Sequence, residues 1–198
     1  MEDKLIKDLM VDSVNKGRAF YDNIVNNGGF HHFELPIDCV DLVNREDKLD
    51  EKNRKYDLPE SLKISFFRPF DELITSINTR CCLYFFEIHD ASAEDTYHAY
   101  KNYEDEERNK SGLKDRKDFE TKVLYVGKVK KNIGKRLSTH FGYAHSKTGG
   151  LQLKYWAKEI KLKLTVHLIV FDENIDDFIN PLELEFTKKL NPLIGKSK

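Results

Sequence analysis

The chain has 198 residues, of which 34% are charged and 12% aromatic, with thirteen Phe and nine Tyr. This length and aromatic content fit one domain with a real core, or a core domain with an extension, and exclude disorder throughout. No apolar run approaches 18 residues and the first residues lack the apolar stretch of a secretory signal. We therefore expect a cytoplasmic, intracellular protein without a membrane span. The three cysteines, Cys39, Cys81 and Cys82, make no disulfide framework and are expected to be packed thiols.

The N-terminal part is predicted to be mainly helical. Apolar residues recur at helical spacing over 3–27, which predicts an amphipathic helix. The stretch 30–36 is compatible with a short strand. Residues 44–60 are charged and almost without core residues, so we expect a loop or linker, and 62–67 is strand-like. We treat 1–75 as an N-terminal extension made of a helix followed by this charged linker.

Two apolar strands flank a charged insertion in the middle of the chain. Residues 81–88 form a continuous apolar run that predicts a buried strand, and 122–127 predicts the next one. Between them, 89–120 is highly charged and has little to bury. We expect an insertion that is partly helical, with a flexible middle around 109–112.

The last part of the chain alternates helices and a strand. Helices are expected at 131–141 and 151–159, and a strand at 162–171. A final helix should begin near Asn180 and end by Asn191. The order of elements predicts an α+β fold over 76–198, with a small three-stranded mixed sheet flanked by helices.

The net charge of −1 hides a strong asymmetry. Residues 121–170 carry eleven Lys or Arg and one acid, Glu159, so this window is about +10 and the rest of the chain about −11. Clustered positive charge in an otherwise acidic protein indicates a polyanionic partner, although a solvated lysine-rich face is the ordinary alternative. The lysines expected to contact nucleic acid are Lys128, Lys130, Lys131, Lys135, Lys147 and Lys154.

Several side chains in this region suit phosphodiester chemistry. Arg136 can present two donors to a phosphate, and His140 lies four residues later, on the same face of a helix. Gly127 would let the backbone come close to a ligand. Glu183 offers a hard oxygen ligand for Mg²⁺, and Glu185 is the competing carboxylate. His31 and His32 also suggest a metal, but the sequence shows no second ligand pair at suitable spacing.

The ordered set of motifs resembles the GIY-YIG nuclease superfamily over roughly residues 76–198. The matching positions are Cys82-Leu83-Tyr84, Tyr125-Val126-Gly127, Arg136, His140, Glu183 and Pro192. The chain departs from the pattern at Cys82, where the family has Gly, at Val126, where it has Ile, and at Gly195, where it has Asn. The step of 41 residues from Tyr84 to Tyr125 is also long for the family.

The resemblance implies a role for each matched residue. Tyr84 would be the general base, Tyr125 would position or polarise the water or the phosphate, and Arg136 would stabilise the pentavalent phosphate. His140 would assist proton transfer or orient its neighbours. Glu183 would bind one divalent ion, Mg²⁺ or Mn²⁺. The function implied is a DNA endonuclease of restriction, defence, mobile-element or repair type. RNA is a second candidate substrate, and a homodimer would allow both strands to be cut.

Other interpretations stay open from the sequence. Tyrosines in apolar strands usually pack in a core, His140 could cap the end of its helix, and Asn180-x-x-Glu183 matches a capping box. The chain could therefore be a non-catalytic module that uses a nuclease-derived fold to bind nucleic acid. A third hypothesis is a protein-interaction role, in which the acidic N-terminal part docks a partner.

Overall fold

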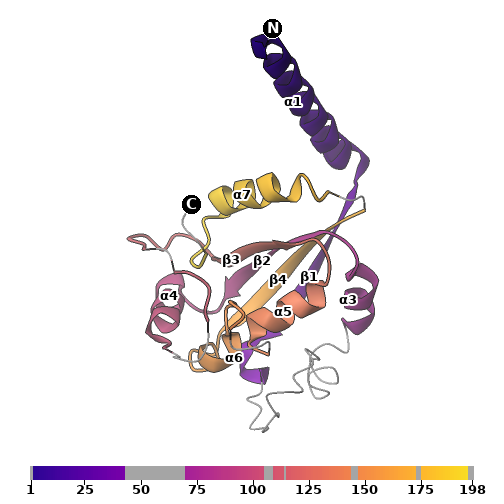
Figure 1. Cartoon of the computed structure of the whole chain (residues 1–198). Coiled ribbons are helices and arrows are strands. Elements are labelled where there is room, and N and C mark those ends of the chain that lie inside the picture. The colour runs from indigo at the N-terminus through magenta and orange to yellow at the C-terminus, as the bar shows by residue number, and fades with distance from the viewer. Residues whose placement is uncertain are drawn as a thin grey trace.

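The computed structural model describes residues 2–42, 70–104, 109–113, 115–143, 147–172 and 175–195. The linker predicted at 44–60 and the strand predicted at 62–67 lie outside these ranges. The described part of the chain is α+β, as expected, with helices packed around one antiparallel sheet (Figure 1). None of the helices in these ranges combines the length and the apolar character needed to cross a bilayer.

The sheet differs from the predicted one in size and in strand direction. Within the described ranges it has four strands in the order β1-β4-β2-β3, all antiparallel, instead of a three-stranded mixed arrangement. The strands are β1 (Phe30–Asp38), β2 (Cys82–His89), β3 (Val123–Val129) and β4 (Lys163–Phe171). Strand direction was not predictable because the helices between β3 and β4 allow the chain to return in either sense.

Strand β1 accounts for the extra member of the sheet. It comes from the part of the chain assigned to the N-terminal extension and pairs with β4 from Phe30 to Asp38. Leu35 and Ile37 point into the core from this strand, at 1% and 3% exposure. Burial of these two side chains and pairing of the β4 edge both favour the added strand.

The central strands β2 and β4 carry the core. Each has a neighbouring strand on both sides. Both faces of β2 are buried, which explains why its sequence is a nearly continuous apolar run. On one face Cys82, Tyr84 and Phe86 pack with residues of α5 (Ile133–Phe141). On the opposite face Leu83 packs against α7 (Ile179–Leu190). The sheet is therefore covered by different helices on its two faces (Figure 1).

The charged insertion packs into the core, contrary to the sequence interpretation. It contains α4 (Ala93–Asn102), whose Tyr97 and Tyr100 are buried. The ring of Tyr100 lies edge-on to Trp156 of α6 (Leu153–Trp156), and its hydroxyl donates to the carbonyl of Ser111. Residue Ser111 in turn donates its backbone N–H to the carbonyl of Gly150 at 2.9 Å. The stretch expected to be flexible is thus anchored at several points.

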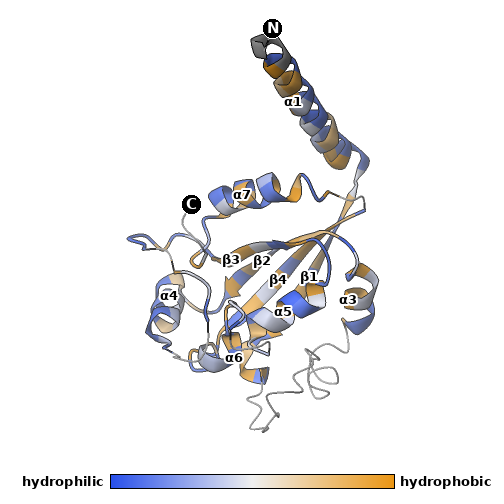
Figure 2. Cartoon of the chain, viewed as in Figure 1, coloured by the Kyte–Doolittle hydropathy of each residue, from blue (hydrophilic) through white to orange (hydrophobic). Residues whose placement is uncertain are grey.

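The N-terminal helix α1 (Glu2–Asn27) extends away from the rest of the molecule at its N-terminal end (Figure 1). Its other end packs against the start of α7, where the ring of Phe20 stacks on Phe178, the residue just before this helix, with centroids 4.1 Å apart. Polar and apolar residues are interspersed along it (Figure 2), and it exposes Leu9, Met10 and Val14. Two short helices complete the fold, η1 (Cys39–Asp41) and α3 (Asp71–Ile77). All three cysteines are buried free thiols, as predicted.

Replacement of a core residue of β1 should measure how far this strand stabilises the fold. We expect Leu35→Ala to lower the free energy of unfolding by about 2–5 kcal/mol, because it leaves a cavity in the core. Urea unfolding followed by circular dichroism gives this value. The exposed Val40, just after β1, provides the control, and Val40→Ala should change stability by less than about 0.5 kcal/mol. Equal effects of the two substitutions would show that β1 is not an integral part of the sheet.

Candidate active site

The two strand tyrosines lie side by side on the face of the sheet that α5 covers. Tyr84 of β2 pairs with Gly127 of β3, and Phe86 pairs with Tyr125, so both tyrosines share one face. Their ring centroids are 6.3 Å apart, with an angle of 27° between the planes. Adjacent strands and matching register therefore bring together two hydroxyls that are 41 residues apart in the sequence.

Gly127 serves this pair of tyrosines. A Cβ atom at this position would lie 2.5 Å from the hydroxyl oxygen of Tyr84 and 2.7 Å from Cε1 of Tyr125. Such contacts are too short for any side chain larger than hydrogen. The glycine is needed because the Tyr84 ring crosses directly over the neighbouring strand. The close approach to a ligand expected from the sequence stays a prediction.

Arg136 of α5 connects both tyrosines. Its Nε donates to the hydroxyl of Tyr84 at 2.8 Å and its Nη2 donates to the hydroxyl of Tyr125 at 3.2 Å. The remaining Nη1 donates to the carbonyl of Gly149 at 3.4 Å. The guanidinium is consequently held from two strands and one loop, so its fork has a fixed orientation before any ligand arrives.

His140 lies beneath this arrangement, fully buried. Its Nε2 is 3.0 Å from the hydroxyl of Tyr84. Burial, with Arg136 as a second cause, holds the pKa of the imidazole well below its usual range. The ring is therefore neutral near pH 7, which rules out the cationic helix cap considered from the sequence. Because arginine only donates, the Tyr84 oxygen accepts from Arg136, whereas the direction of the hydrogen bond between Tyr84 and Nε2 of His140 depends on the tautomer of the ring.

Tyr84 has an environment that opposes the role implied for it. The side chain is completely buried, and burial is the main cause that raises the pKa of its phenol, with Tyr125 adding to the rise and Arg136 opposing it. A general base must reach its water and carry a phenolate. Tyr84 instead bonds to Arg136 and His140, so its position suits support of the arginine better than proton abstraction.

Glu183 reaches the same region from α7, on the other side of the β3 edge. Its carboxylate accepts from Lys128 at 2.9 Å, and Lys128 also donates to the side chain of Asn180. The predicted capping box is wrong, because α7 begins at Ile179 and its N-cap is Phe178. Asn180 lies inside the first turn and bonds to the lysine of β3.

A pocket of about 600 Å³ joins these groups. Tyr125, Arg136 and Glu183 line it, together with residues of 110–112 from the insertion and of 191–195 after α7. Glu183 is the one carboxylate among the described residues that line the pocket. This donor set fits an ion such as Mg²⁺ that binds through one carboxylate and keeps most of its waters, provided that Lys128 gives way.

Two lysines that line the pocket, Lys110 and Lys188, were not predicted as site residues from the sequence. Lys188 follows Glu183 by five residues on α7, and with Leu184 and Thr187 it forms one helical stripe that could have been recognised. Lys110 had no local signal, since it lies in the charged insertion. Its Nζ donates to the carbonyl of Tyr100, and burial lowers the pKa of its amine.

The predicted nucleic-acid lysines differ in their exposure and in their partners. Lys128 and Lys130 are paired with acids, the latter with Asp176 at 3.2 Å. Lys154 is 7% exposed with its Nζ over the Tyr143 ring, so the prediction that it contacts nucleic acid is not supported by its position. The exposed members of the predicted set are Lys130, Lys131, Lys135 and Lys147.

Gly195 occupies the position where the motif expects Asn, and it lines the pocket. Its φ of 145° is a backbone conformation that side-chain-bearing residues rarely adopt. Glycine at this position therefore suits the local backbone conformation.

Comparison of the chain with family models, curated proteins and solved structures gave no match.

The neutral state of His140 predicts a pH dependence of stability. The folded chain holds this ring unprotonated while the unfolded chain protonates it near pH 6.5, so unfolding takes up a proton as the pH falls. We expect the free energy of unfolding to decline below pH 6.5, by up to about 1.4 kcal/mol per pH unit from this group alone.

Denaturant unfolding at pH 6.5, 6.0 and 5.5 measures the effect. His140→Gln should give a shallower decline than the wild type, because its amide does not titrate. His98→Gln, at an exposed histidine of α4, is the matched control and should keep the wild-type slope. Coincident slopes for wild type and His140→Gln would contradict the assignment.

Proposed function

We propose that the chain is a GIY-YIG-type endonuclease that hydrolyses phosphodiester bonds in DNA with the aid of Mg²⁺ or Mn²⁺. The observation that carries the proposal is the Arg136 guanidinium, anchored by two tyrosine hydroxyls in a pocket that Glu183 also lines. A cation held rigidly in the same pocket as a carboxylate is an arrangement that suits phosphoryl chemistry. In this proposal β1 is an addition to the family's smaller sheet.

Binding would begin with the scissile phosphate facing Arg136. The pocket face of the guanidinium offers charge-assisted donors, and its fixed orientation lowers the entropy cost of placing the phosphate. Tyr125 shares the pocket and lies beside the same phosphate, where its hydroxyl can orient water. Lys131, Lys135 and Lys147 are exposed and would attract the DNA backbone from outside.

A divalent ion on Glu183 would offset charge on the phosphoryl oxygens and on the leaving oxygen. The chain's own contribution is to hold that carboxylate ready. Lys128 keeps Glu183 in place, at 23% exposure, and can move to a phosphate oxygen when the carboxylate takes a new partner. Tyr84 and His140 complete the site as positioning residues that keep Arg136 from turning away.

A non-catalytic nucleic-acid-binding module is the second candidate. The Lys128–Glu183 ion pair favours it, because the carboxylate already has a cationic partner. Both candidates predict binding that weakens steeply as salt rises, since both rely on phosphate contacts. Only the enzyme predicts that strand breaks accumulate with time.

Cleavage of supercoiled plasmid in Mg²⁺ or Mn²⁺ tests the proposal. We expect Arg136→Lys and Glu183→Gln each to slow cleavage about 10²–10³-fold, because each removes a group that stabilises charge in the transition state. Glu185→Gln is the matched control on the same helix, since Glu185 is exposed and pairs with Lys188. It should cut at close to the wild-type rate. A wild-type chain that binds plasmid and never cuts it would instead establish the binding module.

The two tyrosines should separate into different roles. We expect Tyr125→Phe to slow cleavage and to lower stability less than Tyr84→Phe does, because its hydroxyl lies at the pocket, where water can accept from Arg136 in its place. Tyr84→Phe should lower the free energy of unfolding by about 1–3 kcal/mol, because it leaves buried groups of Arg136 and His140 without a partner. Cleavage rates and denaturant midpoints for both variants decide this. If Tyr84→Phe abolished cleavage with unchanged stability, Tyr84 would be the base.

A further inference from the structure

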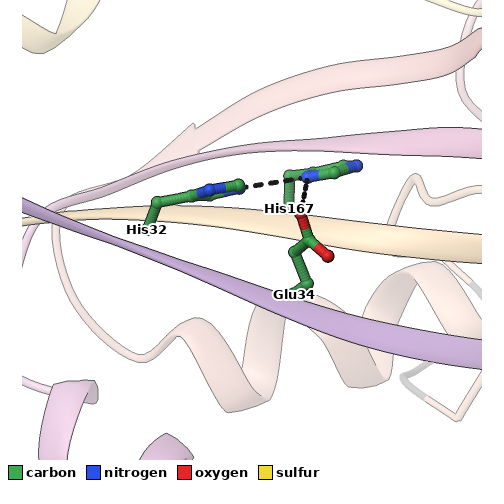
Figure 3. Close-up of side chains that lie close together, drawn as sticks. All are labelled: His32, Glu34 and His167. Atoms are coloured by element: carbon green, nitrogen blue, oxygen red, sulfur yellow. Dashed lines mark hydrogen bonds and ion pairs between the residues drawn. The ribbon is translucent and has the colours of Figure 1, made fainter.

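Two histidines and a glutamate converge on the sheet face opposite α5. His32 and Glu34 come from β1, and His167 comes from β4, directly opposite Glu34 in the strand pairing. Figure 3 shows the three side chains directed toward one point. His32 Nε2 lies 3.0 Å from His167 Nδ1, and Glu34 Oε1 lies 3.7 Å from the same nitrogen. All three donor atoms lie within 4.8 Å of one another.

The neighbours of His167 fix its orientation and its tautomer. Its other nitrogen, Nε2, is 2.9 Å from the carboxylate of Glu87 on β2. A carboxylate at this distance holds the proton on Nε2, which leaves the lone pair of Nδ1 directed at His32 and Glu34. The ring of Phe85 stacks on the ring of His167, with their centroids 4.3 Å apart and an angle of 12° between their planes. A carboxylate behind a histidine is the usual outer support of a metal-binding imidazole.

The geometry of the three donors matches a small tetrahedral ion. Zinc–nitrogen and zinc–oxygen bonds of about 2.0–2.1 Å place neighbouring ligand atoms about 3.3 Å apart. Two of the three separations, 3.0 and 3.7 Å, fall on either side of this value, and the third is within 4.8 Å, so side-chain adjustments would bring the three donors to one ion. Two imidazoles with one carboxylate favour zinc over magnesium, which prefers oxygen ligands.

The paired strands hold the three side chains of this cluster close together. Its members lie on paired strands, whose register fixes the spacing of the side chains, and not on mobile termini or loops. His167 is 8% exposed, whereas His32 and Glu34 are exposed, so an ion could enter from solvent. Glu34 and Glu87 also supply two negative charges to offset a divalent cation.

We propose that the chain binds one Zn²⁺ ion through His32 Nε2, Glu34 Oε1 and His167 Nδ1, with a fourth position open to water or to an outside ligand. The ion would fasten the edge strand β1 to β4. This site is separate from the pocket lined by Glu183, and it does not depend on the nuclease proposal.

Titration of the metal-free chain with Co²⁺, followed by displacement with Zn²⁺, tests the site. We expect visible absorption of four-coordinate Co²⁺ at one ion per chain, displaced by one equivalent of Zn²⁺ and unaffected by excess Mg²⁺. His32→Gln and Glu34→Gln each remove a ligand and should abolish this signal. Both side chains are exposed, so the variants should melt like the wild type in EDTA.

Three further variants separate this site from others. Glu87→Gln should weaken Zn²⁺ binding about 10–100-fold, because it removes the outer support of His167. His31→Gln is the matched control, since this neighbouring histidine pairs with Asp172 and not with the cluster. Glu183→Gln should also bind Zn²⁺ as the wild type does.

Three results would overturn the proposal. The first is the absence of stoichiometric binding. The second is unchanged binding by His32→Gln and Glu34→Gln. The third is a thiolate-to-Co²⁺ band in the near ultraviolet, which would move the ion to a cysteine.

Discussion

The partly buried hydrogen bond between Arg136 and the Tyr84 hydroxyl is the interaction on which the candidate site depends. It joins α5 to the central strand, and it brings a charged guanidinium to the wall of a pocket without leaving it unpartnered. A half-buried cation is costly unless it has partners, and the two tyrosine hydroxyls and the Gly149 carbonyl each accept one hydrogen bond from the guanidinium. Gly127 is part of the same arrangement, because only glycine leaves room for the Tyr84 ring.

The two faces of the sheet have different chemistry because different elements cover them. The face under α5 is closed, and it buries a neutral His140 below the arginine. The opposite face is covered by α7 near β2 and β3, whereas near β1 it exposes His32 and Glu34. The proposed Mg²⁺ ligand, Glu183, lies at the β3 edge and the proposed Zn²⁺ ligands lie toward the β1 edge. One small sheet could thus hold two metals without competition between their ligands.

Much of the local structure was predictable from periodicity and end signals. Helix α5 and strands β2, β3 and β4 lie within two residues of their predicted positions, because apolar spacing reports burial. The insertion was misread since α4 buries tyrosines, whose polar hydroxyls and charged sequence neighbours hide their packing. The sequence suggested a metal at His31 and His32 but showed no further ligands, because His167 is 135 residues from His32 and only strand pairing brings them together.

The sequence by itself determined the α+β class, the basic window and the residue types that suit phosphate chemistry. It could do so because composition, periodicity and motif order depend on residues that are near one another in the chain. Only the tertiary structure decided that Tyr84 is sealed from solvent while Tyr125 lines the pocket, and that β1 belongs to the sheet. Those outcomes depend on strand register and on which face each helix covers, and these follow from packing between segments far apart in the chain.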